Sequence, residues 1–192
     1  MKRAALIVPV VVLIAASCGE PDPAPTAPTS TTSTTSTTAT GASTTKGGVM
    51  KLTSPDFQSE GPIPARYACD GADESPELSI EGTPQNTVSL VLIMDDPDAS
   101  VGTFDHWVAF DIQPTEVIPA NVGVLGTGGL NSWKRLGYGG PCPPSGTHRY
   151  FFRILALDTE LELEEGATKE DVLAASSGHV LGEATLMGTY ER

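Results

Sequence analysis

The chain has 192 residues, enough for one ordinary domain with accessory segments, and its apolar residues occur in runs from which a core can form. Its formal net charge of -13 argues against a nucleic-acid partner, because there is no excess of basic residues to neutralise phosphates. An anion would therefore have to bind locally, inside a pocket of the protein.

Residues 1–17 are typical of an export signal. Lys2 and Arg3 precede an apolar run, Ala4 to Ala16, which has the length of a signal-peptide core rather than of a membrane span. The run leads into Ser17-Cys18, similar to the site at which bacterial lipoproteins are cleaved and lipidated. We therefore expect Cys18 to carry a lipid that anchors an exported protein at the extracytoplasmic face of the cell membrane. An ordinary secretory signal is the alternative.

Residues 18–48 continue from this cysteine as a segment dominated by Ser, Thr and Pro. Between residues 19 and 48, half of the side chains are Ser or Thr and few are charged or apolar. Such a composition cannot bury enough apolar area to offset the entropy of ordering, so we expect a flexible stalk. A flexible chain of about 30 residues reaches roughly 30 Å, enough to hold a domain clear of a membrane.

Residues 49–192 are expected to form one mainly β domain. Strands are predicted at 49–53, 78–80, 87–94, 105–112 and 149–158, with a final segment at 179–190 that returns to the sheet. A helix is predicted between the N-cap Thr168 and Gly178. Because strands outnumber helices and no alternation of strand and helix appears, the pattern favours an antiparallel β-sandwich with one or two peripheral helices.

Acidic residues directly follow the strand 87–94, which is nearly all apolar and is therefore predicted to be central. Burying charged carboxylates at the end of such a strand costs free energy unless they face a pocket, cap a turn or reach solvent. The carboxylates here are those of Asp95, Asp96 and Asp98. Asp98, placed after Pro97, can form an Asx turn. The run indicates either a turn or the acidic side of a site.

The next strand places a histidine close to this turn. Alternation over 105–112 predicts that His106, Val108 and Phe110 share one face, opposite Trp107. A histidine on an apolar strand is commonly a packed core residue, whereas its closeness to three carboxylates indicates a site. Both interpretations of His106 stay open here.

A loop rich in glycine and proline, residues 137–146, precedes the strand 149–158. It is predicted to be neither a helix nor a central strand, because proline has no N–H to donate and glycine loses most on ordering. His148 and Tyr150, two residues apart on an extended chain, point to the same side. A rigid loop set against an imidazole and a phenol is suited to bind a small anion. The alternative is a crossover turn with a structural His148.

Two cysteines remain if Cys18 carries lipid. In an oxidising compartment we expect Cys69 and Cys142 to form a disulfide. The alternative is that Cys142 is a nucleophile with His148 or His106 as its base.

Motifs of common enzymes are missing from the sequence. Neither Gly-x-Ser-x-Gly nor His-Glu-x-x-His occurs, so no catalytic residue, metal or cofactor is predicted. The alternative is a metal site made by His106 with Asp96 and Asp98.

Several motifs of this sequence resemble the phosphatidylethanolamine-binding protein family, and in particular its bacterial Raf-kinase-inhibitor-like branch. They are Asp96-Pro97-Asp98-Ala99, His106-Trp107, Gly139 to Pro144, and His148-Arg149-Tyr150, within a similarity that runs from Met50 to Tyr190. The resemblance implies a Greek-key β-sandwich with an anion pocket at one end. The ligand-binding residues that it implies are Asp96, Asp98, His106, Gly140, Pro141, His148 and Tyr150, with Gly140 as an N–H donor. Ser100 departs from the proline usual in the first motif, and Ile80 from a common tryptophan.

The function expected from these observations is that of a membrane-tethered protein that binds a small anion, such as phosphate or a phospholipid headgroup. Two carboxylates would repel an anion, so we expect a proton on His106 or His148, or one shared by Asp96 or Asp98 with the ligand. The alternative is an inhibitor or regulator of a partner kinase or protease, and an enzyme is the third hypothesis.

Overall fold

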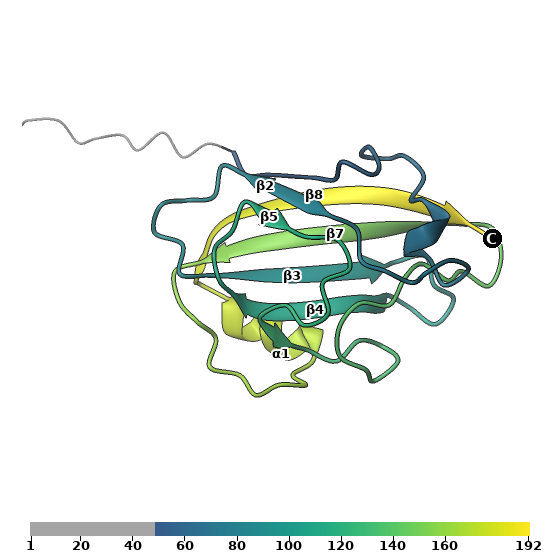
Figure 1. The fold of residues 1–192 in the computed structure, drawn as a ribbon. Coiled ribbons are helices and arrows are strands. Elements are labelled where there is room, and N and C mark those ends of the chain that lie inside the picture. Colours follow the sequence, from purple (N-terminus) through teal and green to yellow (C-terminus); the bar gives the residue numbers. More distant parts are fainter. Residues whose placement is uncertain (1–48) are drawn as a thin grey trace, which may run out of the picture. The chain divides into compact units, whose positions relative to one another are not determined.

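The structure is a computed structural model that describes residues 49–192. The expected signal peptide, the lipidated Cys18 and the stalk fall in residues 1–48, outside the described residues, and stay predictions. In the described part, strands dominate, accompanied by the α-helix α1, Lys169–Ser176, and the short 3-10 helix η1, Ala65–Tyr67 (Figure 1).

The larger sheet has five strands in the order β6-β4-β3-β7-β8, and every neighbouring pair is antiparallel. Their bounds are Ser89–Asp96 for β3, Phe104–Ile112 for β4, Thr127–Gly128 for β6, Thr147–Leu157 for β7 and Val180–Glu191 for β8. All residues of β3 are buried. The prediction of a central strand covered on both faces is therefore confirmed.

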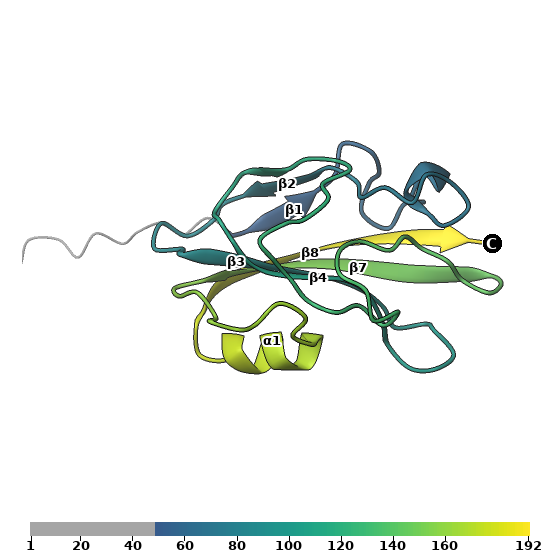
Figure 2. The ribbon, with the colours of Figure 1, turned by 60° about the horizontal axis from the view of Figure 1, so that its bottom comes forward.

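The smaller sheet has three strands in the order β1-β2-β5, also antiparallel. Their bounds are Lys51–Thr53 for β1, Leu78–Glu81 for β2 and Val117–Ile118 for β5. Figure 2 shows β1 and β2 over one face of the larger sheet and α1 over the other. The expected mainly β, antiparallel sandwich with peripheral helices is confirmed.

Each face of the larger sheet has its own apolar core. Alternation along β3 sends Leu90, Leu92 and Met94 to the core between the two sheets. Val91 and Ile93 point the other way, into the core beneath α1. This packing on both sides fixes the position of the end of β3, where the acidic residues begin.

The helix α1 begins as predicted. The Thr168 hydroxyl accepts a hydrogen bond from the Asp171 N–H, and the Asp171 carboxylate accepts one from the Thr168 N–H at 3.1 Å. This is a capping box. Gly178 follows the helix with a φ of 86°, a conformation that favours glycine. No helix among residues 49–192 combines the length and the apolar character needed to cross a bilayer.

Candidate functional site

A cavity of about 240 Å³ opens where the end of β3 meets the beginnings of β4 and β7. Asp96, His106 and His148 supply its titratable groups. Most of the remaining wall is apolar and comes from Val101, Phe104, Trp133, Cys142, Pro143 and Pro144. Three of the predicted site residues thus meet at one hollow, although they lie up to 52 residues apart in the sequence.

A β-bulge turns His106 into this cavity. Met94 pairs with Trp107 and Asp95 pairs with Asp105, so His106 has no partner on β3. The extra residue breaks the alternation of β4 at this point. The predicted face shared by His106, Val108 and Phe110 is therefore wrong for His106. Its ring lies 5.2 Å from the ring of Tyr150, on the side opposite to Val108.

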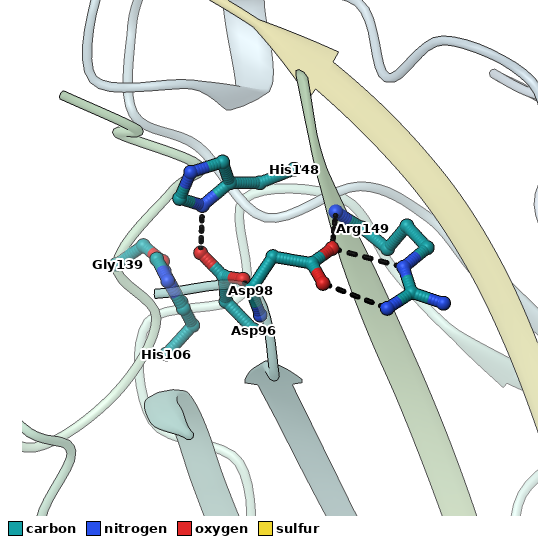
Figure 3. A network of polar contacts seen from close by, with 6 residues as sticks. All are labelled: Asp96, Asp98, His106, Gly139, His148 and Arg149. Atoms are coloured by element: carbon teal, nitrogen blue, oxygen red, sulfur yellow. Dashed lines mark hydrogen bonds and ion pairs between the residues drawn. The ribbon is translucent and has the colours of Figure 1, made fainter. Parts of the chain in front are cut away.

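The His106 ring is fixed by one hydrogen bond and by aromatic neighbours. Its Nδ1 lies 2.8 Å from the carbonyl oxygen of Gly139 (Figure 3), and because a carbonyl only accepts, Nδ1 carries the proton. Trp133 and Tyr150 pack edge-on against the ring. Burial lowers the pKa of His106 below 6.5, so the ring is neutral at neutral pH and Nε2 keeps its lone pair.

His148 and Asp96 form a hydrogen-bonded pair of imidazole and carboxylate in the cavity. His148 Nδ1 lies 2.7 Å from Asp96 Oδ2, and both residues are buried (Figure 3). The other carboxylate oxygen of Asp96 accepts the Asp98 N–H at 2.8 Å. The Asx turn in this segment is therefore made by Asp96 and not, as predicted, by Asp98. With Nδ1 directed at a carboxylate, Nε2 of His148 is left for other contacts.

Asp98 points away from the cavity toward Arg149 (Figure 3). Its carboxylate accepts the Arg149 backbone N–H at 3.0 Å and two guanidinium N–H groups at 2.9 and 2.7 Å. The hydrogen bond with the Arg149 side chain lowers the pKa of Asp98 to about 2. The structure thus places Asp98 outside the cavity, in a surface ion pair, and leaves Asp96 as the carboxylate that a ligand would meet.

Tyr150 lies beneath the cavity and is completely buried. Its hydroxyl makes no hydrogen bond of good geometry among residues 49–192, although the Asp96 carboxylate and the Cys142 backbone are close enough to affect its pKa. Burial, followed by the charge of Asp96, raises the pKa of Tyr150, so the hydroxyl keeps its proton. A buried hydroxyl without a partner is costly, and one beside a binding cavity indicates a contact that a bound molecule or water completes.

Gly140 and Pro141 support the cavity wall from behind and do not line it. The Gly140 N–H donates to Asp73 Oδ1 at 2.6 Å, which corrects the expectation that it is offered to a ligand. A side chain at Gly140 would come within 2.2 Å of the Tyr67 carbonyl oxygen, so glycine is required by close packing. The Pro141 carbonyl accepts the Cys69 N–H at 3.1 Å.

Cys69 and Cys142 are joined in a disulfide, as predicted. The bond excludes the alternative in which Cys142 is a free nucleophile. The proposed metal cluster of His106, Asp96 and Asp98 does not form either, because Asp98 is turned outward. No group of three or more metal-binding side chains with suitable geometry occurs in the described part of the chain.

Comparison with known proteins decides the family. The family model described as phosphatidylethanolamine-binding protein matches residues 53–191, nearly the whole described domain. The chain belongs to the phosphatidylethanolamine-binding protein family. The resemblance drawn from the sequence motifs is thereby confirmed at the level of the family.

Relatives and solved structures of this family agree with the match. A UPF0098 protein of Methanothermobacter thermautotrophicus is 54% identical over 151 residues, which cover 74% of this chain and 99% of the relative. A phosphatidylethanolamine-binding protein homologue from Chlamydia trachomatis is 43% identical, with a TM-score of 0.73 over 75% of this chain and 98% of its own. Escherichia coli YbcL, described as a member of the mammalian family, shares the fold at 24% identity and a TM-score of 0.70, over 76% of this chain and 99% of its own.

The aromatic wall of the cavity was not anticipated from the sequence. Trp133 reaches the cavity because Asn131, which is buried, accepts the Trp133 and Arg135 N–H groups at 3.0 and 3.1 Å and so shapes the loop. Phe104 packs edge-on against Trp133, with 4.6 Å between ring centroids. The sequence feature that could have indicated this position of Trp133 is an asparagine two residues before the tryptophan, next to a glycine-rich loop.

Proposed function

We propose that the domain binds a small anion of the phosphate or phospholipid-headgroup type in the cavity formed by Asp96, His106 and His148. The observation that carries this proposal is the buried Tyr150 hydroxyl, which makes no hydrogen bond of good geometry in the described part of the chain. It is a protonated donor beneath two imidazoles whose Nδ1 atoms are already engaged. The cavity itself offers a ligand the imidazoles of His106 and His148 and an apolar rim, and the Tyr150 hydroxyl lies beneath this lining.

A proton has to accompany the anion. Asp98 is neutralised by Arg149, so Asp96 is the carboxylate that opposes a bound anion. His106 is neutral in the empty site, and its Nε2 accepts rather than donates a hydrogen bond. Protonation of Nε2 on His106 or on His148 converts an acceptor into a charged donor. We therefore expect binding to take up a proton.

Calorimetry with inorganic phosphate tests the proposal. His106→Ala should weaken binding by about 1 to 3 kcal/mol, because a charge-assisted hydrogen bond is lost from a buried site. The matched control is His179→Ala, which removes an exposed histidine paired with Asp158. An affinity that is the same in wild type, His106→Ala and His179→Ala would contradict the proposed site.

The source of the anion is a separate question that mass spectrometry can answer. Protein purified without added phosphate is denatured, and the released small molecules are identified. A phospholipid in the released fraction assigns the cavity to a headgroup, whereas inorganic phosphate or a phosphorylated metabolite assigns it to a soluble anion. If no anion is released, and the protein also binds no phosphate in calorimetry, neither a phospholipid headgroup nor a soluble anion is the ligand.

We propose further that the protein is exported and anchored by lipid on Cys18, as a lipoprotein of the bacterial Raf-kinase-inhibitor-like branch. The disulfide supports an oxidising location, since such bonds are rare where thiols are kept reduced. Labelling cells with a radioactive fatty acid should mark the wild type and not Cys18→Ser. Equal labelling would contradict the anchor, and a soluble, unlabelled wild type would favour an ordinary secretory signal.

The alternative of a regulator that binds a kinase or protease makes a different prediction. A partner that contacts the cavity rim should be captured by the immobilised protein and released by saturating phosphate. Capture that is unaffected by phosphate would place the partner elsewhere, and phosphate binding without capture favours the anion receptor.

A further inference from the structure

A partly buried cluster of charges lies on the α1 face of the larger sheet, behind the cavity. It consists of Asp95 on β3, Asp105 on β4, Arg153 on β7 and Lys169, the first residue of α1. Asp95 is 4% exposed and Lys169 is 9% exposed. Lys169 pairs with Asp105, and its Nζ lies 3.7 Å from Asp95 Oδ2. Arg153 pairs with Asp95. The proposed function uses none of these four groups.

The cluster includes two like charges on facing strands. Asp95 and Asp105 are direct cross-strand partners, and like charges in such positions destabilise the pairing. Asp95 has Arg153 as a second cation, whereas Lys169 is the cation paired with Asp105 in the described part of the chain. A cation is disfavoured at a helix N-terminus, so α1 itself gains nothing from Lys169 there. The position of Lys169 is explained by the two carboxylates.

Asp105 is also the residue next to the bulge that turns His106 into the cavity. Without the bulge, continuous pairing from Met94 with Trp107 would oppose Asp95 to His106 and Asp96 to Asp105. Because paired residues point to the same face, His106 would then lie under α1 and Asp105 would face the cavity beside Asp96. A shift of one residue thus exchanges an imidazole for a second carboxylate in the site.

We propose that Lys169 is a positioning residue for the cavity: by neutralising Asp105 opposite Asp95, it selects the bulged register in which His106 faces the ligand. This inference rests on the proposed function for its effect on binding, but the orientation of His106 can be tested without any ligand. An α1 residue on one face of the sheet thereby determines which side chain is presented on the other.

Backbone contacts hold the same segment from the side of the loop. Ser132 N donates to the Asp105 carbonyl, the Asp105 N–H donates to Ser132 Oγ, and Gly139 N donates to the His106 carbonyl at 3.0 Å. These bonds satisfy both backbone groups of Asp105 and the His106 carbonyl, and none of them involves the Asp105 carboxylate. The charge of Lys169 therefore selects the register. If the opposing charge on Asp105 is removed, Lys169 should no longer be needed to keep the bulged register.

The test is the contact between the His106 and Tyr150 rings, measured by nuclear Overhauser effects in solution NMR. The chain has three histidines, so the ring signals can be assigned by single substitutions. Wild type should show the contact, since the ring centroids are 5.2 Å apart. Lys169→Met should lose it, and the double variant Lys169→Met with Asp105→Asn should regain it. Lys51→Met, the same change at an exposed position on β1, is the matched control and should keep it.

Retention of the ring contact in Lys169→Met would overturn the proposal. Failure of the double variant to regain it, whether through unfolding or through a changed ring environment, would also overturn it, because Lys169 would then act by seating α1. In a parallel titration with inorganic phosphate, Lys169→Met should bind about tenfold or more weakly, with recovery in the double variant. A wild type that binds no phosphate but shows the ring contact would reject the proposed function alone.

Discussion

The two faces of the larger sheet hold their carboxylates in different ways. On the α1 face, Asp95 and Asp105 are paired with the ammonium group of Lys169 and the guanidinium group of Arg153. On the cavity face, Asp96 is paired with the imidazole of His148. Asp95 and Asp96 are adjacent on β3, but their side chains lie on opposite faces of the sheet and pair with different kinds of group. Ammonium and guanidinium groups hold the carboxylates on the α1 face, whereas an imidazole holds the carboxylate that lines the cavity.

The largest effect is expected on the α1 face. Lys169→Met leaves two facing carboxylates with too little positive charge, and breaking such a buried pair should lower the free energy of unfolding by about 3 to 5 kcal/mol. Chemical denaturation measures the change. Lys51→Met should stay within about 0.5 kcal/mol of the wild type, as an exposed substitution does. Equal effects of the two substitutions would remove the distinction between the faces.

The wall of the cavity depends on a covalent link. Replacement of both Cys69 and Cys142 by serine opens a loop with a sequence separation of 73 residues and should cost about 3 to 4 kcal/mol of stability in the chain-entropy model. Because Cys142 lines the cavity, phosphate affinity should fall as well. Denaturation and calorimetry on the same preparation measure both. Unchanged stability would show that the loops hold the wall without the bond.

Tyr150→Phe should separate binding from folding. Loss of the hydroxyl should weaken phosphate binding by about 1 to 3 kcal/mol if the ligand accepts a hydrogen bond from it. The free energy of unfolding should not fall, because the hydroxyl makes no hydrogen bond of good geometry in the described residues of the empty protein. A substitution that lowers stability and leaves affinity unchanged would assign Tyr150 to the core alone.

The smallest effect is expected at the surface pair of Asp98 with Arg149. The folded pKa of Asp98 is depressed to about 2, so its contribution to stability is present above the unfolded value of 3.8 and is lost as the pH falls toward 2. The pair is partly exposed to solvent, and Asp98→Asn should therefore cost less than about 1 kcal/mol at neutral pH. Denaturation curves of wild type and Asp98→Asn should converge near pH 2. A gap that widens on acidification would contradict the pairing.

Much of the fold followed from local patterns. The apolar run of β3, the cap of α1 at Thr168 and the two cysteines are each readable from a few neighbouring residues, and all were confirmed. The motifs also predicted that Asp96, His106 and His148 belong to one site, and all three line the same cavity. These features depend on propensity, periodicity and composition, which the sequence displays directly.

The failures share a different origin, because each depends on a partner distant in the sequence. The bulge at His106 is a property of the β3–β4 register and not of the alternation within 105–112. The Gly140 N–H is taken by Asp73, 67 residues away, and Asp98 by Arg149, 51 residues away. A sequence pattern identifies a donor or a carboxylate, but it does not predict which distant group will form the hydrogen bond or ion pair with it.

The most direct test of a titratable cavity is the pH dependence of sulfate binding, because sulfate does not itself titrate in the neutral range. Calorimetry between pH 8 and pH 5.5 should show affinity that rises as the pH falls, by up to about tenfold per pH unit when one full proton is taken up. The rise should continue below pH 6.5, since burial lowers the pKa of His106 in the empty site and the rise ends only when the empty site is itself protonated. Affinity that is constant, or tighter at pH 8, would contradict a site whose charge is supplied by histidine.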